Sequence, residues 1–412
     1  MEEGRLRREI DVHKHERRYE TAIALLKTDK INEADRKLII RFVEDLESEG
    51  IGKPSIIKYT MLLRTPSKLY GRGFSKANER SIRSLVGAIN KSKYADWTKH
   101  DLKVTLKRFY KWLRKCSNDK DPGGTAWIKI TSPKRGILPE ELLDENDIAR
   151  LLAACDNSRD GALTHCIWET GGRIAELLDL RRKHVQFDQY GAILKFSGNT
   201  GDRPIRIVES SPSLAAWFNK HPIDESDAPL WTVIGDKHHS EPLLYASARM
   251  MLNRLSPPAH RAKIKKRVNP HSFSHSRATY LASVLNERQM KKYLGWTTAS
   301  KIPSTYVHLS GRDVDKAILC LNGIEQEGHK DIPKFLPIMC PRCQQANDAT
   351  LRFCGKCGLP LRIEAALELE KTRKEADDLM SKLLEDPEVR TLLLAKLKEI
   401  SVLGTAQEVP SQ

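Results

Sequence analysis

The first part of the chain repeats apolar and polar positions with the period of an α-helix. The pattern is clearest over 101–115, where Leu102, Leu106, Phe109 and Leu113 recur every three or four residues and basic side chains fill the other faces. The same spacing predicts helices at about 12–28, 33–49, 54–69, 76–90 and 97–115. We therefore expect a helical domain over residues 1–118.

A change of pattern follows this domain. The segment 119–142 contains Asp121-Pro-Gly-Gly124 and is typical of a linker. Beyond it, Asp144 to Asp147 predict a capped helix start, and helical spacing continues over about 159–181 and again up to about 323. Short β-type runs separated by turn formers lie between these helices, at 185–187, 192–196 and 204–208. The predicted fold is mainly α with a small antiparallel β patch, and a second domain covers 143–325.

Two Cys-x-x-Cys pairs lie ten residues apart near the end of the chain. They are Cys340 with Cys343 and Cys354 with Cys357. Four thiolates at this spacing can close a tetrahedral zinc site, and no coordination position remains open for catalysis. We therefore predict a structural zinc ribbon at 336–361, whose folding depends on the metal because so short a segment lacks a core.

The segment 362–400 predicts two amphipathic helices that are interrupted at Asp386-Pro387. Its leucine stripe needs a partner, either another part of this chain or a second copy. No run of 18 apolar residues exists, which excludes a membrane span. The N-terminal residues contain no apolar leader either, and we expect a cytoplasmic, nucleoid-associated protein.

Positive charge is concentrated in one segment. The chain carries 70 Lys and Arg against 54 Asp and Glu, a net charge of +16, while residues 53–135 alone carry 21 against 5. A merely basic surface would not require such segregation, whereas a face that neutralises phosphates would, so the charge indicates nucleic acid. Candidate DNA contacts on the helix at 97–115 are Lys103, Lys107, Arg108 and Lys111.

Three motifs occur in order in the second domain. They are Thr170-Gly-Gly-Arg-Ile-Ala-Glu-Leu-Leu178, Pro270-His-Ser-Phe-Ser-His-Ser-Arg-Ala-Thr279, and Tyr293-Leu-Gly-Trp296 followed by Tyr306-Val-His-Leu309. In type, order and spacing they resemble the two arginine boxes and the nucleophile segment of the tyrosine recombinases, the phage-integrase and Xer-type family. The four-cysteine tail resembles archaeal members. The resemblance implies a core-binding domain at 1–118 and a DNA breaking-rejoining catalytic domain at 143–325.

The resemblance also implies an activity. A site-specific recombinase or integrase of this family cleaves and rejoins double-stranded DNA through a 3′-phosphotyrosyl intermediate, as a homo-oligomer and without a catalytic metal or nucleotide. It assigns the nucleophile to Tyr306, a phosphate clamp to Arg173 and a phosphate hydrogen bond to the Trp296 indole. His271 would act as a base or phosphate donor, and Glu176 would support the site. Phosphoryl transfer to a tyrosine needs such donors where charge builds up, and an acid for the leaving oxygen.

Two positions depart from the family pattern. Ser274 stands where the family has its second arginine, and Asn199 stands where it has the lysine of a β-hairpin. Loss of one donor aimed at transition-state charge typically lowers the rate about 100- to 1,000-fold. Residues near these positions that could compensate are Lys195, Arg203, Arg206, His275 and Arg277. The departures leave an alternative open: a degenerate recombinase-like protein that binds DNA or regulates without cutting it.

Overall fold

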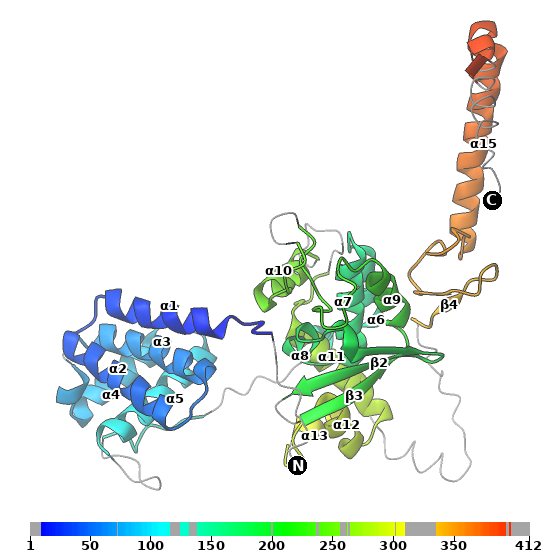
Figure 1. The fold of residues 1–412 in the computed structure, drawn as a ribbon. Coiled ribbons are helices and arrows are strands. Elements are labelled where there is room, and N and C mark those ends of the chain that lie inside the picture. The colour runs from blue at the N-terminus through cyan, green and yellow to red at the C-terminus, as the bar shows by residue number, and fades with distance from the viewer. Residues whose placement is uncertain are drawn as a thin grey trace, which may run out of the picture. The chain divides into compact units, whose positions relative to one another are not determined.

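The computed structural model describes residues 10–71, 73–115, 124–131, 138–198, 201–235, 239–255, 262, 264–300, 302–309, 335–392 and 395–396, with only the backbone at 307–309 (Figure 1). The chain divides into two compact units. A helical unit comprises Leu6–Leu142 with Pro242–Ala248, and a larger unit comprises Leu143–Glu241 and Arg249–Gln412. The described residues are mainly helical with small antiparallel sheets, which confirms the predicted fold class.

Over its described residues up to Lys115, the helical unit contains five α-helices. They are α1 (His15–Thr28), α2 (Glu33–Ser48), α3 (Lys53–Tyr70), α4 (Glu79–Lys91) and α5 (Asp96–Leu113), with a 3-10 turn, η1 (Phe74–Lys76). Asn32 and Asn78 cap α2 and α4 by accepting hydrogen bonds from backbone N–H groups. Gly71, with a φ of 67°, ends α3 in the left-handed conformation. The helices predicted from apolar spacing are confirmed to within a few residues at each end.

One apolar core joins these helices. The ring of Phe109 on α5 meets the rings of Phe42 and Phe74 edge-on, with centroids 5.3 and 5.0 Å apart. Ile128 is buried in the same core, and Trp127 packs against it. Part of the predicted linker at 119–142 therefore belongs to the helical unit, because its apolar side chains leave water by packing there.

The larger unit contains an antiparallel sheet in the order β1–β2–β3, formed by Val185–Asp188, Gly191–Gly198 and Gly201–Ile207. The three predicted strands are thereby confirmed. The described helices between 143 and 309 are α6 (Glu145–Ala153), α7 (Ser158–Thr170), α8 (Ile174–Leu178), α9 (Ser211–Asn219), α10 (Tyr245–Leu255), α11 (Pro270–Val284), α12 (Glu287–Leu294) and α13 (Ile302–Leu309) (Figure 1). Two 3-10 turns are η2 (Pro139–Glu141) and η3 (Arg182–His184). Asp144 and Asp147 form the predicted capping box of α6.

The four-cysteine segment contains a small hairpin, β4 (Ile338–Met339) with β5 (Ala346–Asn347), and leads into α15 (Ile363–Glu385). This helix ends at Asp386-Pro387, as predicted, and helical backbone resumes at 387–392. Ala365 is buried, whereas Leu379 is 60 % exposed, and the described structure leaves most of the leucine stripe uncovered. No helix in the described part of the chain has the length and apolar character needed to cross a membrane.

Candidate active site

Arg173 lies in a tight break between two helices. The sequence predicts helical patterns over about 159–181, and the structure divides them: Gly171, with a φ of 57°, ends α7 in the left-handed conformation. A Cβ atom on Gly172 would lie 2.5 Å from Cε2 of Phe196 on β2, so the backbone approaches the sheet more closely than any other residue would allow. The loop projects Arg173 from the start of α8 with half of its side chain exposed.

Glu176 is fully buried between two arginines. Its Oε2 accepts a hydrogen bond from Nη2 of Arg203 at 2.7 Å, and its Oε1 accepts from Nη1 of Arg173 at 3.2 Å. Arg203 is itself buried and also donates to the carbonyl of Tyr293 at 3.0 Å. The charge of Arg203 is therefore neutralised by Glu176 inside the protein. The same carboxylate holds the guanidinium of Arg173 by a hydrogen bond. The role of Arg203 as the buried partner of Glu176 depends on strand pairing that local sequence does not reveal.

Tyr306 on α13 is buried against α11, α12 and Trp296, which follows α12. Its ring stacks on Trp296 with centroids 5.7 Å apart and planes 13° apart. Its hydroxyl lies 2.5 Å from Nδ1 of His275 on α11. Nη1 of Arg173 donates to the carbonyl of Gly295, next to Trp296, at 3.2 Å. Burial raises the pKa of Tyr306 to about 12, so the hydroxyl remains protonated at neutral pH.

His271 and His275 lie one turn apart on α11. Their ring centroids are 6.5 Å apart. His271 is exposed, while His275 is half-buried, and burial together with the nearby His271 lowers the pKa of His275 below its ordinary value. The structure thus places His275, rather than His271, in contact with the Tyr306 hydroxyl.

Ser274 lies beside the loop that carries Arg173. Its Oγ is 3.4 Å from the carbonyl of Gly172 and 3.3 Å from the carbonyl of Pro270. A short neutral side chain therefore occupies the position at which the resemblance leads us to expect an arginine. Arg277, one turn further along α11, is buried, and its guanidinium lies over the ring of Tyr280 at 5.0 Å. Its charge is thus directed into the protein interior.

The hairpin positions do not supply an obvious replacement for the lysine. Lys195 is exposed on β2, on the strand face opposite to Phe196, because adjacent residues of a strand point to opposite faces. Phe196 is the residue that meets the Gly172 loop, so Lys195 points away from that loop. Arg206 on β3 pairs with Asp188 at 2.7 Å. Asn199 lies outside the described residues.

The four predicted DNA contacts lie along α5 in the helical unit. Each side chain is partly exposed. Arg108 donates to Glu49 at 3.1 Å and lies over the ring of Tyr59 at 5.6 Å. Lys103, Lys107 and Lys111 occupy neighbouring turns of the same helix.

The four cysteines form one candidate metal centre. The sulfur atoms of Cys340, Cys343, Cys354 and Cys357 all lie within 4.8 Å of one another. Burial alone would raise the pKa of Cys354, but backbone N–H donors and the neighbouring thiols lower it to about 6, which favours the thiolate that metals bind. Asn347 connects the two cysteine turns, because its Oδ1 accepts from Gly355 N at 3.0 Å and its Nδ2 donates to Gln345 O at 2.7 Å. The donor set therefore fits a metal ion held by four sulfurs.

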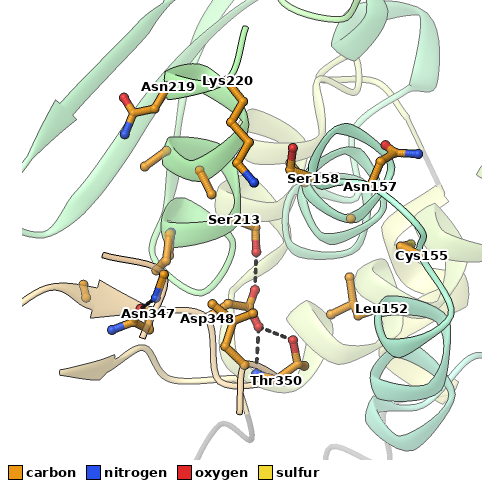
Figure 2. Close-up of a pocket in the computed structure, with 18 of the residues that line it drawn as sticks. Leu152, Cys155, Asn157, Ser158, Ser213, Asn219, Lys220, Asn347, Asp348 and Thr350 are labelled. Carbon is orange, nitrogen blue, oxygen red and sulfur yellow. Dashed lines mark hydrogen bonds between the residues drawn. The ribbon is translucent and has the colours of Figure 1, made fainter. Parts of the chain in front are cut away.

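A buried polar contact joins this segment to α7 and α9. Oδ2 of Asp348 lies 2.8 Å from Nδ1 of His165, a fully buried residue of α7, and also accepts from Ser213 Oγ on α9. Oδ1 accepts from the backbone and hydroxyl of Thr350, as Figure 2 shows. Burial raises the pKa of Asp348, but these donors, His165 above all, hold it well below its ordinary value. Around the contact lies a cavity of about 790 Å³ into which Lys220 extends (Figure 2).

Known proteins resemble this chain in sequence and in fold. Residues 141–312 match the phage integrase family. The chain is 24% identical over 247 residues to the tyrosine recombinase XerA of Pyrococcus horikoshii, a match that covers 59% of this chain and 79% of that protein. It is 27% identical over 221 residues to the tyrosine recombinase XerD of Lacticaseibacillus casei, covering 50% and 70%.

Among solved structures, a lambda integrase tetramer bound to a Holliday junction aligns with a TM-score of 0.52 and 15% identity, covering 71% of this chain and 82% of that one. This likeness shows a shared fold, that of the integrases. The match of residues 141–312 to the phage integrase family and the likeness to two Xer-type tyrosine recombinases agree with this fold.

Proposed function

We propose that this chain is a site-specific DNA recombinase that cleaves and rejoins double-stranded DNA through a bond between Tyr306 and a 3′-phosphate. The observation that carries the proposal is the surroundings of Tyr306: His275 lies at its hydroxyl and Trp296 stacks on its ring, while Arg173 donates to the carbonyl of Gly295, the residue before Trp296. The match of residues 141–312 to the phage integrase family supports cutting over the alternative of a protein that only binds DNA.

Each side chain has a defined part in this reaction. The Tyr306 oxygen attacks phosphorus, and the bond from phosphorus to the 5′ oxygen breaks. Arg173, held by Glu176, presents its planar fork to the non-bridging oxygens, where negative charge grows. The Trp296 indole N–H and the exposed His271 donate to the same phosphate. Because the phosphotyrosyl bond retains the free energy of the phosphodiester, rejoining requires no nucleotide.

The second arginine of the family is absent, and this sets the expected rate. Ser274 contributes no charge beside Arg173, so one arginine clamps the phosphate alone. We expect slow cleavage, and Ser274→Arg should raise the rate by about 100-fold, since one donor at the transition state has that effect. No increase would mean that another group already serves this position. Ser274→Thr, which adds no charge, is the matched control.

The remaining parts of the chain bind DNA and hold the structure together. The helical unit corresponds to a core-binding domain, in which Lys103, Lys107, Arg108 and Lys111 contact DNA phosphates. The protein acts in the cytoplasm, on the DNA of the nucleoid. The chain works as a homo-oligomer on its site, and α15 offers an uncovered surface for a neighbour. The four cysteines hold zinc, which supplies folding free energy to the ribbon.

Covalent capture tests the proposal even though the target sequence is not known. The full chain is incubated with sheared genomic DNA of its source organism, denatured, and isolated with any attached DNA, whose ends are sequenced. We expect adducts at a recurring sequence, linked through the peptide that contains Tyr306. Tyr306→Phe, which retains the ring but not the hydroxyl, should give none. Equal capture by wild type and Tyr306→Phe, or none by either, contradicts the proposed function.

A further inference from the structure

The histidine that hydrogen-bonds to the Tyr306 hydroxyl is not the histidine that the family resemblance assigns to the phosphate. Nδ1 of His275 lies 2.5 Å from Oη of Tyr306, and the two rings are 5.9 Å apart between centroids. His271 lies a full turn earlier on α11 and is exposed. The two histidines, at positions i and i+4, thus share one helix face, but His275 contacts the Tyr306 hydroxyl whereas His271 is exposed to solvent.

Attack on phosphorus requires removal of the Tyr306 proton. Tyr306 is buried in a cluster with apolar residues of α11 and α12, such as Ala278 and Leu294, and its pKa of about 12 leaves almost no phenolate at neutral pH. A general base within hydrogen-bond distance typically accelerates such a step about 100- to 10,000-fold. Among the described residues, His275 is the basic side chain that hydrogen-bonds to this hydroxyl.

We propose that His275 is the group that accepts the Tyr306 proton during cleavage and returns it during rejoining. The inference rests on the proposed function and adds a catalytic residue to it. Its geometry requires the tautomer in which Nε2 carries the hydrogen and Nδ1 accepts. Half-burial beside His271 favours this neutral form, which is the form a base must have.

Cleavage and rejoining can each be written with balanced protons, using His275, Tyr306 and water and no other protein group. In cleavage, the Tyr306 proton moves to Nδ1 of His275, the tyrosine oxygen bonds to phosphorus, and the electrons of the broken P–O bond leave with the 5′ oxygen, which takes a proton from water. In rejoining, the 5′ hydroxyl loses its proton to water and attacks phosphorus. Tyr306 then leaves as phenolate and recovers its proton from His275.

His275→Asn is the informative variant, because the amide oxygen of asparagine takes the place of Nδ1 and accepts a hydrogen bond but not a proton. The probe is a suicide duplex built from the captured genomic site, and the measurement is the single-turnover rate of adduct formation. We expect a loss of about 100-fold or more. Full activity of His275→Asn would show that His275 only positions Tyr306 and would overturn the proposal. Thermal unfolding and circular dichroism of the variant confirm that it folds.

Two further measurements separate a base from a structural residue. Among the described residues, the titratable groups around His275 are His271 and Tyr280 on α11, Tyr306 on α13 and Tyr293 on α12, whereas Met290 and Leu294 of α12 carry no charge. Burial raises the pKa of Tyr293 to about 12, so this tyrosine stays neutral over the pH range of the test. The wild-type rate should rise with pH and level off at a midpoint below about 6.5, the ordinary pKa of histidine. His271→Ala should be slower yet retain this plateau, whereas His275→Asn should continue to rise with pH. A plateau retained in His275→Asn contradicts the role.

A substrate with sulfur in place of the bridging 5′ oxygen provides the second measurement, because a thiolate leaves without an acid. This substrate should not rescue His275→Asn if the residue is the base. Rescue would assign His275 to the leaving group instead. If wild type itself forms no adduct, the proposed function fails; if wild type cleaves and His275→Asn cleaves equally well, only the present inference fails.

Discussion

Nη2 of Arg203 donates to Oε2 of Glu176 at 2.7 Å, and both side chains are buried. The pair connects β3 to the first turn of α8, where Arg173 also contacts Glu176. A buried ion pair contributes little net stability when complete, but removal of one charge leaves the other without compensation. The orientation of Arg173, the proposed phosphate clamp, therefore depends on a buried carboxylate that Arg203 also holds.

Glu176→Gln should therefore destabilise the larger unit by about 3–5 kcal/mol, because the buried guanidinium of Arg203 loses its counter-charge. Urea unfolding followed by tryptophan fluorescence measures the change. Asp188→Asn removes the carboxylate of an exposed pair with Arg206 on the same hairpin and is the matched control, for which we expect no detectable change. Similar midpoints for the two variants would contradict the internal role of Arg203.

Gly172→Ala should disrupt the loop that carries Arg173. The added methyl would lie 2.5 Å from the Phe196 ring, so either the ring or the loop must move, at a cost of about 1–3 kcal/mol. Adduct formation should decrease with it. Gly87→Ala in α4 is the control, since nothing lies within 4 Å of its added methyl and alanine stabilises a helix by about 0.4–1 kcal/mol. Equal stabilities would show that the loop does not need a glycine.

Asp348→Asn should weaken attachment of the ribbon to α7 by about 2 kcal/mol, because hydrogen bonds to a charged acceptor are lost. The pKa of Asp348 is lowered in the folded protein, so its contribution is present above the ordinary value of about 3.9 and fades as pH falls towards the lower folded value. The difference in unfolding free energy between wild type and variant should thus shrink below about pH 4. Asp377→Asn on exposed α15 serves as control, and a difference independent of pH would exclude this carboxylate as the cause.

Native mass spectrometry should find one zinc ion per chain. Cys343→Ser should abolish or strongly weaken binding, because a structural zinc site needs all four thiolates. Cys155→Ser should retain zinc, since burial raises the pKa of Cys155 to about 12 and it lies outside the cluster. Chelation should expose 336–361 to proteases, as expected for a segment that folds with its metal. Metal-free protein with an intact ribbon would contradict the assignment.

The sequence by itself determined the elements and the chemistry available to them. Apolar spacing is a local property of the chain, and it predicted α1 to α5 and the three strands of the larger unit. The cysteine spacing predicted one four-sulfur cluster, and the motif order predicted the family. These features repeat over a few residues and do not depend on long-range packing. The helical patterns over about 159–181 did not reveal the break at Gly171, because the tight approach of Gly172 to Phe196 depends on a strand that follows later in the chain.

Only the tertiary structure decided which charged groups meet. Arg203, considered from sequence as a spare phosphate clamp, is committed to Glu176, and His275 rather than His271 lies at the Tyr306 hydroxyl. His165 and Asp348, 183 residues apart, contact each other inside the protein, although neither residue belongs to a recognisable sequence motif. The physical reason is that the spacing of apolar residues along the chain shows which face of a helix or strand is buried. Which side chains contact one another depends on how the helices and strands pack. The chemistry that a side chain such as Tyr306 can perform depends on the side chains that contact it.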